Sequence, residues 1–459
     1  MTNRKRRQFK LLKIEARQLI PLAAPILAAQ LAQQTLAFVD TVMAGRVSAT
    51  DLAGVAVGGS IWGPIFLFLY GVLLAVTPIV AQLHGAGKTA ETGPLTRKGI
   101  VVAAPLVVIA IVLLQNAGFI FTWMDVDLQV ARISTAYLKA ISWGVPALVL
   151  FFLLRNLSEG MGLVRPSMLI GLASIPVNIA GNYIFIYGKL GFPAMGGIGC
   201  GWASALSLWF MCSCMLLTIW RVRRYDKTHF FDLNKTCGAE GAPQLLRLGL
   251  PIGLSLLVEA SIFALIALFL SPLGALTVAS HQITLNYSSM IFMIPLSLAS
   301  AITIRVGHAI GRQRDDRARL SSKTGLILNS SIAVVTATLT LFFAERIAGI
   351  YTENPQVIII AVGLLHLNAL YQVSDALQIG AAAALRGYKD SRVPLLMVVV
   401  SYWIIGLPLG YSLALTHFWG EPLGAKGFWI SLIIGLSVAA VLLGLRLYRV
   451  SRKKLPLPC

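Results

Sequence analysis

Long apolar runs alternate with short polar connections along most of this chain. Twelve runs can be distinguished, and each is long enough for a helix that crosses a bilayer, which takes about 20 apolar residues. Lipid offers the backbone no hydrogen-bond partners, so such runs are expected to be helical. The predicted spans lie roughly at 19–44, 53–81, 99–122, 133–154, 166–188, 198–220, 248–270, 275–304, 324–344, 357–385, 393–416 and 427–448.

Composition supports an all-α integral membrane protein. Of the 459 residues, 57% are hydrophobic and 12% are charged, whereas about a quarter of the residues in a soluble domain are charged. This balance excludes a soluble multidomain enzyme and a disordered chain. A porin-like barrel is disfavoured, because its strands appear only as short alternating segments.

The positions of Lys and Arg predict the topology. With the N-terminus in the cytoplasm, 32 of the 38 basic residues fall in cytoplasmic connections and 6 fall outside, as the positive-inside rule requires. Both termini are therefore predicted to be cytoplasmic, and Arg155 is counted in a cytoplasmic connection. The net charge of +20 is then a topology signal rather than a sign of nucleic-acid binding. The apolar run from Leu19 is interpreted as a retained span and not as a signal peptide.

A polar segment near the middle of the chain separates two sets of six spans. The halves also share an internal repeat: at an offset of 226 residues, Pro25 matches Pro251 and Val80 matches Val306. Repeats that begin on the same side of the membrane are typical of transporters, although a duplicated structural membrane protein is an alternative. The predicted organisation is a basic segment (1–18), a first lobe (19–220), a linker (221–247), a second lobe (248–448) and a basic tail (449–459).

Three acidic residues, Asp40, Glu259 and Asp375, lie within the apolar runs, where an ionised group costs at least ~2.5 kcal/mol. No Lys or Arg is expected at a comparable depth, so each acid has to be protonated or bind a cation. At about 1.5 Å per residue, Glu259 and Asp375 lie about 18 and 16 Å from the cytoplasmic surface, whereas Asp40 is nearer the outside. The alternative role is a protonated hydrogen-bonding group that fixes helix packing.

Further polar residues share helix faces with these acids and are candidates for lining a cavity. Each also has a simpler interpretation as a hydrogen-bonding contact between helices. The set comprises Gln30 and Gln33 on the helix of Asp40, Ser255 one turn before Glu259, and Tyr371 and Gln378 on the face of Asp375.

The sequence contains no Walker motif, no dinucleotide-binding context and no cluster of His or Cys with metal-ligand spacing. It therefore predicts no enzymatic activity, no cofactor and no structural metal. An ion gradient remains as the source of energy for transport.

Seven segments occur in the order and form seen in one transporter family. The chain resembles the MATE (multidrug and toxic compound extrusion) family, in its NorM-like branch, over nearly its whole length. The segments are FVDTVMAGRVSATDLA (38–53), TPIVAQLHGAGK (77–88), NYIFIYGKLGFPAMGGIGCG (182–201), GLPIGLSLLVEASIF (249–263), PLSLASAITIRVGHAIG (295–311), YQVSDALQ (371–378) and LRGYKD (385–390).

The resemblance implies a monomeric antiporter of the bacterial inner membrane, with two six-helix lobes around a V-shaped cavity. It would export organic cations and other amphipathic drugs in exchange for inward Na⁺ or H⁺. The implied N-lobe cation site consists of Asp40, Asn178 and Asn182, and the C-lobe site consists of Glu259, Tyr371 and Asp375. In some other branches an acid replaces the second of the two asparagines.

A flippase for lipid-linked precursors is the main alternative, since its fold is related. Its central cavity would be expected to carry basic residues that hold a pyrophosphate, and no such residues are expected in these spans. A membrane-embedded enzyme would need a nucleophile with a base, or a metal site, and the sequence offers neither.

Overall fold

The computed structural model describes residues 3–235 and 241–452. Within these residues the chain is helical and contains no strand. The first nine α-helices are α1 (Asn3–Gly45), α2 (Ala49–Leu73), α3 (Val76–Gly85), α4 (Thr92–Gln115), α5 (Gly118–Trp123), α6 (Leu128–Ser142), α7 (Val145–Gly160), α8 (Arg165–Tyr187) and α9 (Gly197–Arg221), with short 3₁₀ turns η1 (Thr89–Glu91) and η2 (Arg223–Thr228).

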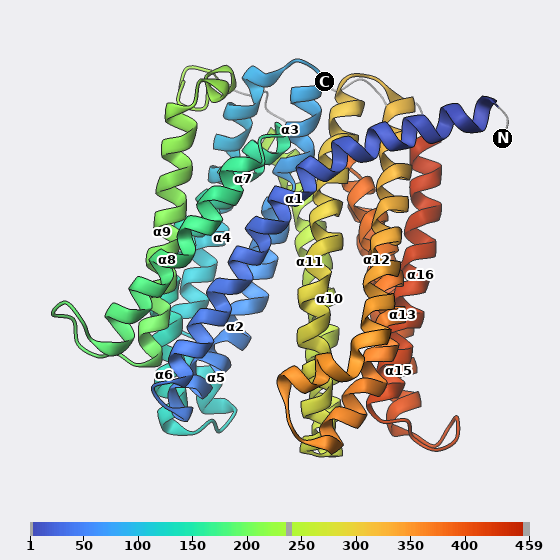
Figure 1. The fold of residues 1–459 in the computed structure, drawn as a ribbon. Coiled ribbons are helices and arrows are strands. Elements are labelled where there is room, and N and C mark those ends of the chain that lie inside the picture. The colour runs from blue at the N-terminus through green and yellow to red at the C-terminus, as the bar shows by residue number, and fades with distance from the viewer. Residues whose placement is uncertain (1–2, 236–240, 453–459) are drawn as a thin grey trace. The chain divides into compact units, whose positions relative to one another are not determined.

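The second half of the chain repeats this pattern of long helices and short connections (Figure 1). A π-helical segment, η4, interrupts one of its spans. The elements are α10 (Gly241–Leu270), η3 (Ser271–Leu273), α11 (Ala275–Gly311), α12 (Asp315–Tyr351), α13 (Pro355–Gly387), α14 (Arg392–Val399), η4 (Val400–Gly406), α15 (Leu407–Leu415) and α16 (Ala425–Arg452).

The helices account for the twelve predicted spans. Among the described residues, 11 spans are long and apolar enough to cross a membrane, and α6 with α7 supplies a twelfth that is bent by 48°. The bend falls where Pro146 occupies the first turn of α7. Proline lacks the N–H that would continue the preceding helix, and its fixed φ suits the start of a new one. The prediction of an all-α membrane protein with twelve spans is confirmed.

The helices form two compact units. The first unit comprises the described residues of 28–253, and the second unit combines the described residues of 1–27 with those of 254–459. The long helices α1 and α10 each contribute to both units.

The internal repeat is visible as the same close helix contact in both units. A Cβ atom added to Gly160 would lie 2.7 Å from Cγ1 of Val80, and one added to Gly387 would lie 2.8 Å from Cγ1 of Val306. The two valines are partners in the predicted repeat, and only glycine permits so close an approach. The sequence repeat therefore corresponds to a repeat in three dimensions.

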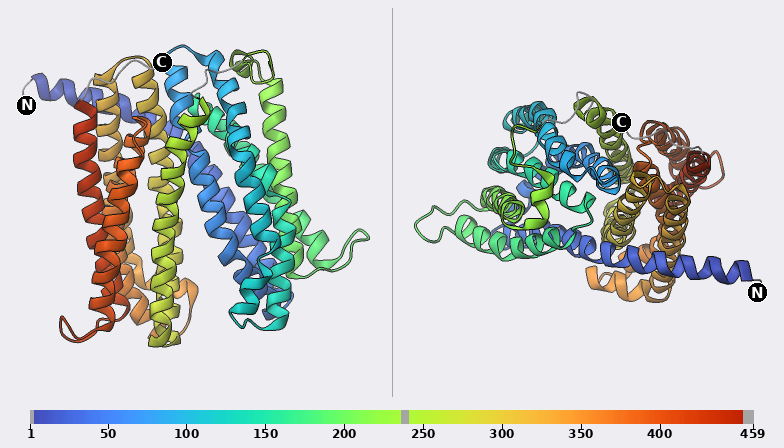
Figure 2. Two further views of the ribbon diagram at one scale, coloured as in Figure 1. Left: turned by 180° about the vertical axis from the view of Figure 1, so that it is seen from behind. Right: turned by 90° about the horizontal axis from the view of Figure 1, so that it is seen from above.

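The beginning of α1 packs against helices of the second unit (Figure 2). Leu19 and Ala23 belong to an apolar cluster with residues of α11 and α13. Glu15, also buried, accepts hydrogen bonds from Nε and Nη2 of Arg305 at 2.9 Å each and from Oγ of Ser321 at 2.6 Å. A carboxylate with this many donors holds the first turns of α1 on α11 and α12.

Part of the predicted linker is an ordered element of the first unit. Tyr225 in η2 is buried, and its hydroxyl lies 2.6 Å from Oγ of Ser158 in α7. Nη1 of Arg97 in α4 donates to the carbonyl of Phe230 at 2.9 Å. These contacts attach residues 221–235 to the helices that precede them.

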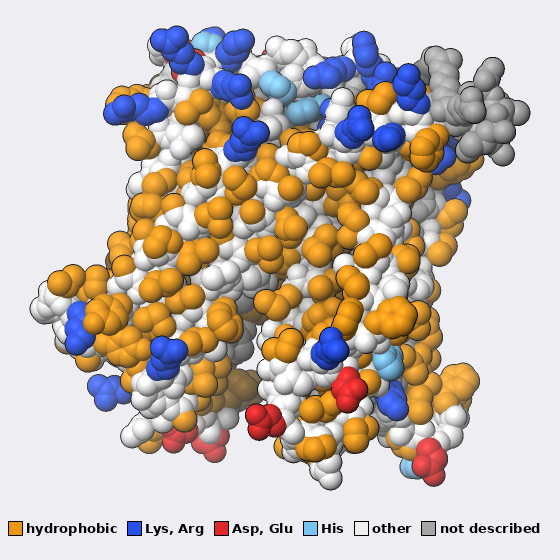
Figure 3. Space-filling model, viewed as in Figure 1, with side chains coloured by type: hydrophobic (Ala, Val, Ile, Leu, Met, Phe, Trp, Pro, Cys, Tyr) orange, Lys and Arg blue, Asp and Glu red, His pale blue; other side chains and the backbone are white. Residues whose placement is uncertain are grey.

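Apolar and basic side chains occupy different parts of the helix surfaces, as is expected of membrane spans. In each unit the flanks of the helices carry apolar side chains, and Lys and Arg gather at one end of the helices (Figure 3). This asymmetry agrees with the count of basic residues by connection. The cytoplasmic placement of that end stays a prediction.

Candidate functional site

Asp40 is the centre of a polar cluster inside the first unit. Its Oδ1 accepts hydrogen bonds from Nδ2 of Asn178 at 3.1 Å and from Nδ2 of Asn182 at 2.6 Å. Its Oδ2 accepts a hydrogen bond of 2.6 Å from Oγ of Ser204. The structure thus brings together the three residues expected at this site and adds a fourth, Ser204, from α9.

Helix α8 positions the two asparagines. They are four residues apart and so lie on one face, and Nδ2 of Asn182 also contacts Oδ1 of Asn178 at 3.1 Å. The helix ends at Gly188, which adopts a left-handed conformation with φ of 66°. A Cβ atom there would lie 2.5 Å from the amide nitrogen of Ala194, so only glycine allows the chain to turn back toward α9.

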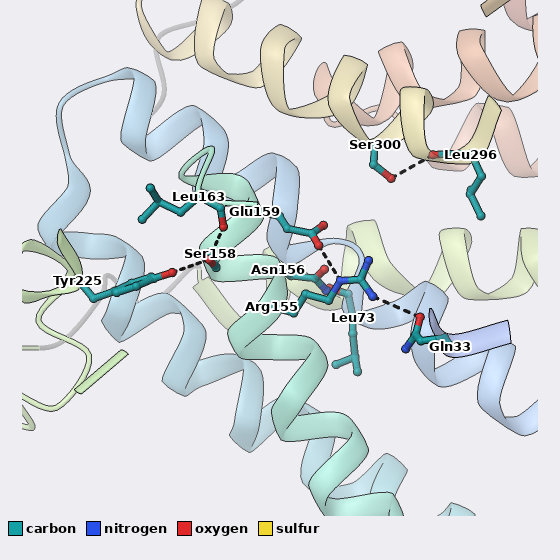
Figure 4. A network of polar contacts seen from close by, with 10 residues as sticks. All are labelled: Gln33, Leu73, Arg155, Asn156, Ser158, Glu159, Leu163, Tyr225, Leu296 and Ser300. Atoms are coloured by element: carbon teal, nitrogen blue, oxygen red, sulfur yellow. Dashed lines mark hydrogen bonds and ion pairs between the residues drawn. The ribbon is translucent and has the colours of Figure 1, made fainter. Parts of the chain in front are cut away.

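Gln33, expected to line a cavity near Asp40, contacts a buried ion pair (Figure 4). Nε of Arg155 lies 2.6 Å from Oε1 of Glu159, and Nη1 of Arg155 donates to Oε1 of Gln33 at 3.3 Å. Arg155 is only 3% exposed and lies within α7.

The expectation that no base lies among the spans is therefore wrong, because Arg155 is part of a transmembrane helix rather than of a connection. Its charge is balanced by Glu159 one turn later, which is why the helix tolerates it. The i, i+4 spacing of the two residues is the sequence signal that predicts such a pair.

Gln30 lies on the same helix face as Gln33 and is also buried. Both polar atoms of its side-chain amide lack a hydrogen-bond partner among the described residues. Three polar side chains therefore follow one another along α1 in the first unit. Gln33 is bound by Arg155, Gln30 has no hydrogen-bond partner among the described residues, and Asp40 accepts three hydrogen bonds.

Glu259 and Asp375 belong to the second unit, on α10 and α13. Oε1 of Glu259 accepts a hydrogen bond of 2.9 Å from Nε2 of Gln378. Asp375 is buried and lies within electrostatic range of Glu259. Ser255, one turn before Glu259, is half-buried on the same helix.

Tyr371 completes the expected group in the second unit. Its ring packs edge-on against Trp429, with 5.5 Å between the ring centroids, and it lies within electrostatic range of both Asp375 and Glu259. Tyr402, on the π-helical segment η4, is buried in the same apolar cluster. Sequence reasoning missed Tyr402, because no spacing along the chain relates η4 to α13.

The two units place different side chains at matching positions of the repeat. Gln33 and Glu259 are separated by the repeat offset of 226 residues, and each is contacted by a polar side chain from a later helix, Arg155 in one unit and Gln378 in the other. The repeat partner of Asp40 is Ile266, which is buried among apolar side chains. The two units therefore share a helical scaffold but carry different side chains at these positions.

The three acids share one property that matters chemically. None of the three acids takes part in the ion pairs of Arg155, His229, Arg305 and Arg446, while the positive charge of Arg386 acts on Glu259. A carboxylate buried among spans without a paired base needs a proton or a bound cation to balance its charge. The described residues contain no group of three or more His, Cys, Asp or Glu that could hold a metal ion.

The MatE family model matches this chain twice, at residues 25–184 and at residues 251–412. The two matches correspond to the two halves of the repeat. The chain is 46% identical over 433 residues to the multidrug resistance protein NorM of Photobacterium profundum, covering 94% of this chain and 95% of that protein. It is 44% identical over 445 residues to the multidrug resistance protein MdtK of Edwardsiella ictaluri, covering 96% of each.

Solved structures of transporters share the fold. The eukaryotic MATE transporter AtDTX14 superposes with a TM-score of 0.86 at 20% identity, covering 97% of this chain and 99% of that one. The bent form of the Vibrio cholerae MATE transporter VcmN gives a TM-score of 0.84 at 18% identity, covering 97% and 99%. With the family model matching both halves and relatives matching nearly the full length, this chain belongs to the MATE family of transporters.

Proposed function

We propose that this protein is a multidrug efflux antiporter, which exports cationic amphipathic compounds in exchange for the inward movement of Na⁺ or H⁺. The observation that carries the proposal is the presence of three carboxylates within the apolar helices, the buried Asp40 and Asp375 and the half-buried Glu259, outside the ion pairs of Arg155, His229, Arg305 and Arg446. An ion that binds to such a carboxylate neutralises its charge, and the charge returns when the ion leaves. Coupling of ion movement to drug transport requires a change of this kind. Relatives at 44–46% identity are named multidrug resistance proteins.

The proposed substrates follow from the charge of the buried groups. An organic ammonium ion is attracted to carboxylates in surroundings of low dielectric and to aromatic faces. Arg155 does not oppose this preference, because Glu159 balances its charge. We therefore expect cationic dyes and drugs to be transported in preference to anionic ones.

The proposed setting is the inner membrane of a bacterium, with both termini in the cytoplasm and the protein acting as a monomer. The excess of Lys and Arg in alternate connections supports this orientation. No cofactor is proposed, and the coupling ion is the only inorganic partner.

A flippase for lipid-linked precursors remains the second candidate, because the spans do contain a buried base. A pyrophosphate carries several negative charges, and one arginine already paired with Glu159 does not balance them. The presence of Arg155 within the spans is therefore weak support for a flippase, because its charge is already balanced by Glu159.

The test is drug efflux from proteoliposomes driven by a Na⁺ gradient alone or by a pH gradient alone. We expect Asp375→Asn and Glu259→Gln to insert normally and to lose gradient-driven efflux, because an amide carries no charge for an ion to balance. Glu353→Gln, an exposed acid between α12 and α13, is the matched control and should transport at the wild-type rate. Efflux at the wild-type rate in both site variants would eliminate this coupling site.

A further inference from the structure

Helix α1 is much longer than a membrane span. Its 43 residues correspond to about 65 Å at about 1.5 Å per residue, whereas the hydrocarbon core of a bilayer is ~30 Å thick. The part before Leu19 precedes the apolar run and therefore lies outside that core. In Figures 1 and 2 it crosses the helices of the second unit near the end where Lys and Arg gather, and its start reaches beyond them. This part of α1 is therefore at the level of the lipid headgroups.

Lys10, Lys13 and Arg17 form one face of this part of the helix, which we call the basic face. They are spaced three and four residues apart and are therefore neighbours on the helix surface. All three side chains are exposed, and none of them takes part in an ion pair within the described residues. Like charges at this spacing repel one another, so the basic face favours an anionic partner.

The basic face points away from the helix bundle. Glu15 is buried and binds Arg305 of α11. Lys13 and Arg17 are two residues to either side of Glu15, which places them about 160° from it around the helix. Glu15 is also the only acid among residues 3–20. Because Glu15 is bound by Arg305, this part of α1 supplies no carboxylate to neutralise the basic face.

Large apolar side chains flank the basic face. Phe9 is 65% exposed, Ile20 is 51% exposed and Ile14 is 42% exposed. Around the helix axis, Phe9 and Ile20 lie on one flank of the basic face and Ile14 lies on the other. Exposure of such side chains to water is unfavourable, whereas the boundary between headgroups and acyl chains removes them from water. Basic and apolar side chains on adjoining faces are typical of helices that lie in the membrane interface.

We propose that the basic face of α1 binds the anionic headgroups of phospholipids, in the leaflet at the end of the helices where Lys and Arg gather. Phosphate oxygens accept charge-assisted hydrogen bonds from Lys and Arg, and an anionic leaflet attracts clusters of such residues. A nucleic acid matches the charge but offers no apolar phase to Phe9, Ile14 and Ile20, so lipid is the partner that fits both features. The inference concerns what holds the start of α1 and goes beyond the proposed efflux function.

The test is hydrogen–deuterium exchange of the full-length protein in nanodiscs, followed by mass spectrometry in peptides that cover residues 9–20. One kind of nanodisc contains phosphatidylcholine alone, and the other also contains phosphatidylglycerol. We expect phosphatidylglycerol to slow exchange in these peptides at least about fivefold, which is what one basic residue contributes near an anionic surface. Bound lipid makes local opening of the helix more costly. High salt should remove the difference, because it screens the charges.

The variant Lys10→Gln/Lys13→Gln/Arg17→Gln should exchange at the same rate in both kinds of nanodisc. Its fold should be retained, because the three side chains are exposed and the contact of Glu15 with Arg305 is unchanged. The variant Lys10→Arg/Lys13→Arg/Arg17→Lys keeps the charge and should keep the effect of phosphatidylglycerol.

The matched control is Arg223→Gln/Arg224→Gln/Lys227→Gln, which removes the same charge from exposed residues of η2. It should keep the effect of phosphatidylglycerol on residues 9–20, since the proposed contact is local to α1. An effect that disappears in this control would overturn the inference, because total charge rather than the basic face would then attract the lipid.

Three further outcomes would also overturn the inference. The first is equal exchange of the wild-type protein in both kinds of nanodisc, and the second is an effect of phosphatidylglycerol that persists in the triple glutamine variant of α1. The third is slower exchange when RNA is added to phosphatidylcholine nanodiscs, with no effect of phosphatidylglycerol, which would identify a nucleic-acid surface. Drug efflux is not measured here, so the proposed function is decided separately by the proteoliposome experiment.

Discussion

Nε of Arg155 lies 2.6 Å from Oε1 of Glu159, one helical turn later in α7, and both side chains are almost completely buried. The guanidinium also lies over the ring of Phe152, 5.8 Å from its centroid, and contacts Gln33 in α1. An ion pair in this position is a structural unit, because either charge alone would be buried without compensation.

Removing one partner of this pair should destabilise the protein strongly. We expect Arg155→Met to lower the free energy of unfolding by about 3–5 kcal/mol, since it leaves the carboxylate of Glu159 buried and unpaired. The double variant Arg155→Met/Glu159→Gln should regain most of that loss. Thermal unfolding of the purified proteins in detergent measures both. Equal loss in the single and double variants would show that the pair contributes through packing rather than charge.

Ser204 should matter to the cluster around Asp40 although sequence reasoning did not include it. Ser204→Ala removes a hydrogen bond of 2.6 Å to the carboxylate, and hydrogen bonds to charged groups contribute about 1.5–3 kcal/mol. We expect a loss of that size in stability together with a changed dependence of efflux on the driving ion.

The control for Ser204 is Ser207→Ala on the same helix. Ser204 is half-buried and Ser207 is buried, but the hydroxyl of Ser207 bonds only to the carbonyl of Ala203, so its removal should leave ion dependence unchanged. Identical efflux profiles for the two variants would remove Ser204 from the site.

Glu15 should hold the first turns of α1 on the second unit. Glu15→Gln weakens the bonds from Arg305 and Ser321, and the exposed Lys13 and Arg17 beside it are trypsin sites. We expect limited proteolysis at these sites to proceed several times faster, because local opening becomes less costly. Glu345→Gln, an exposed acid on α12, is the control. Equal cleavage rates in all three proteins would contradict this role.

Lys389, in the connection between α13 and α14, should make stability depend on pH. Burial lowers the pKa of its ammonium group from 10.5 to about 8. Between these values the unfolded chain binds a proton that the folded protein does not, so the free energy of unfolding should rise as the pH increases from about 8 to about 10.5. Below pH 8 the lysine is charged in both states, and the cost of burying it is fully present.

Replacing Lys389 by Met should abolish this rise and stabilise the protein at neutral pH. Lys88→Met, an exposed lysine in a connection of the first half, should leave the rise in place. Melting temperatures from pH 7 to pH 10 give the comparison. A wild-type curve without a rise above pH 8 would mean that Lys389 keeps its charge in the folded protein.

The sequence by itself determined the spans, their repeat and the three acids that lie within the spans. Apolar runs of bilayer length have to be helical in lipid, so hydropathy alone predicts the twelve spans. The match of Val80 with Val306 predicts the repeat, which the close contacts of Gly160 and Gly387 confirm. An acid inside an apolar run is visible without any knowledge of packing.

Tertiary structure alone decided which side chains meet. Ser204 reaches Asp40 across 164 residues, and Ser288 and Thr336 line the same cavity as Asp375 from two other helices. Helical periodicity fixes only which residues share a face of one helix, whereas hydrogen-bond partners on different helices depend on how those helices pack. The same limit applies to Arg155. In the sequence it follows an apolar run and looks like part of a connection, whereas in the structure it lies within α7 and is buried in an ion pair with Glu159.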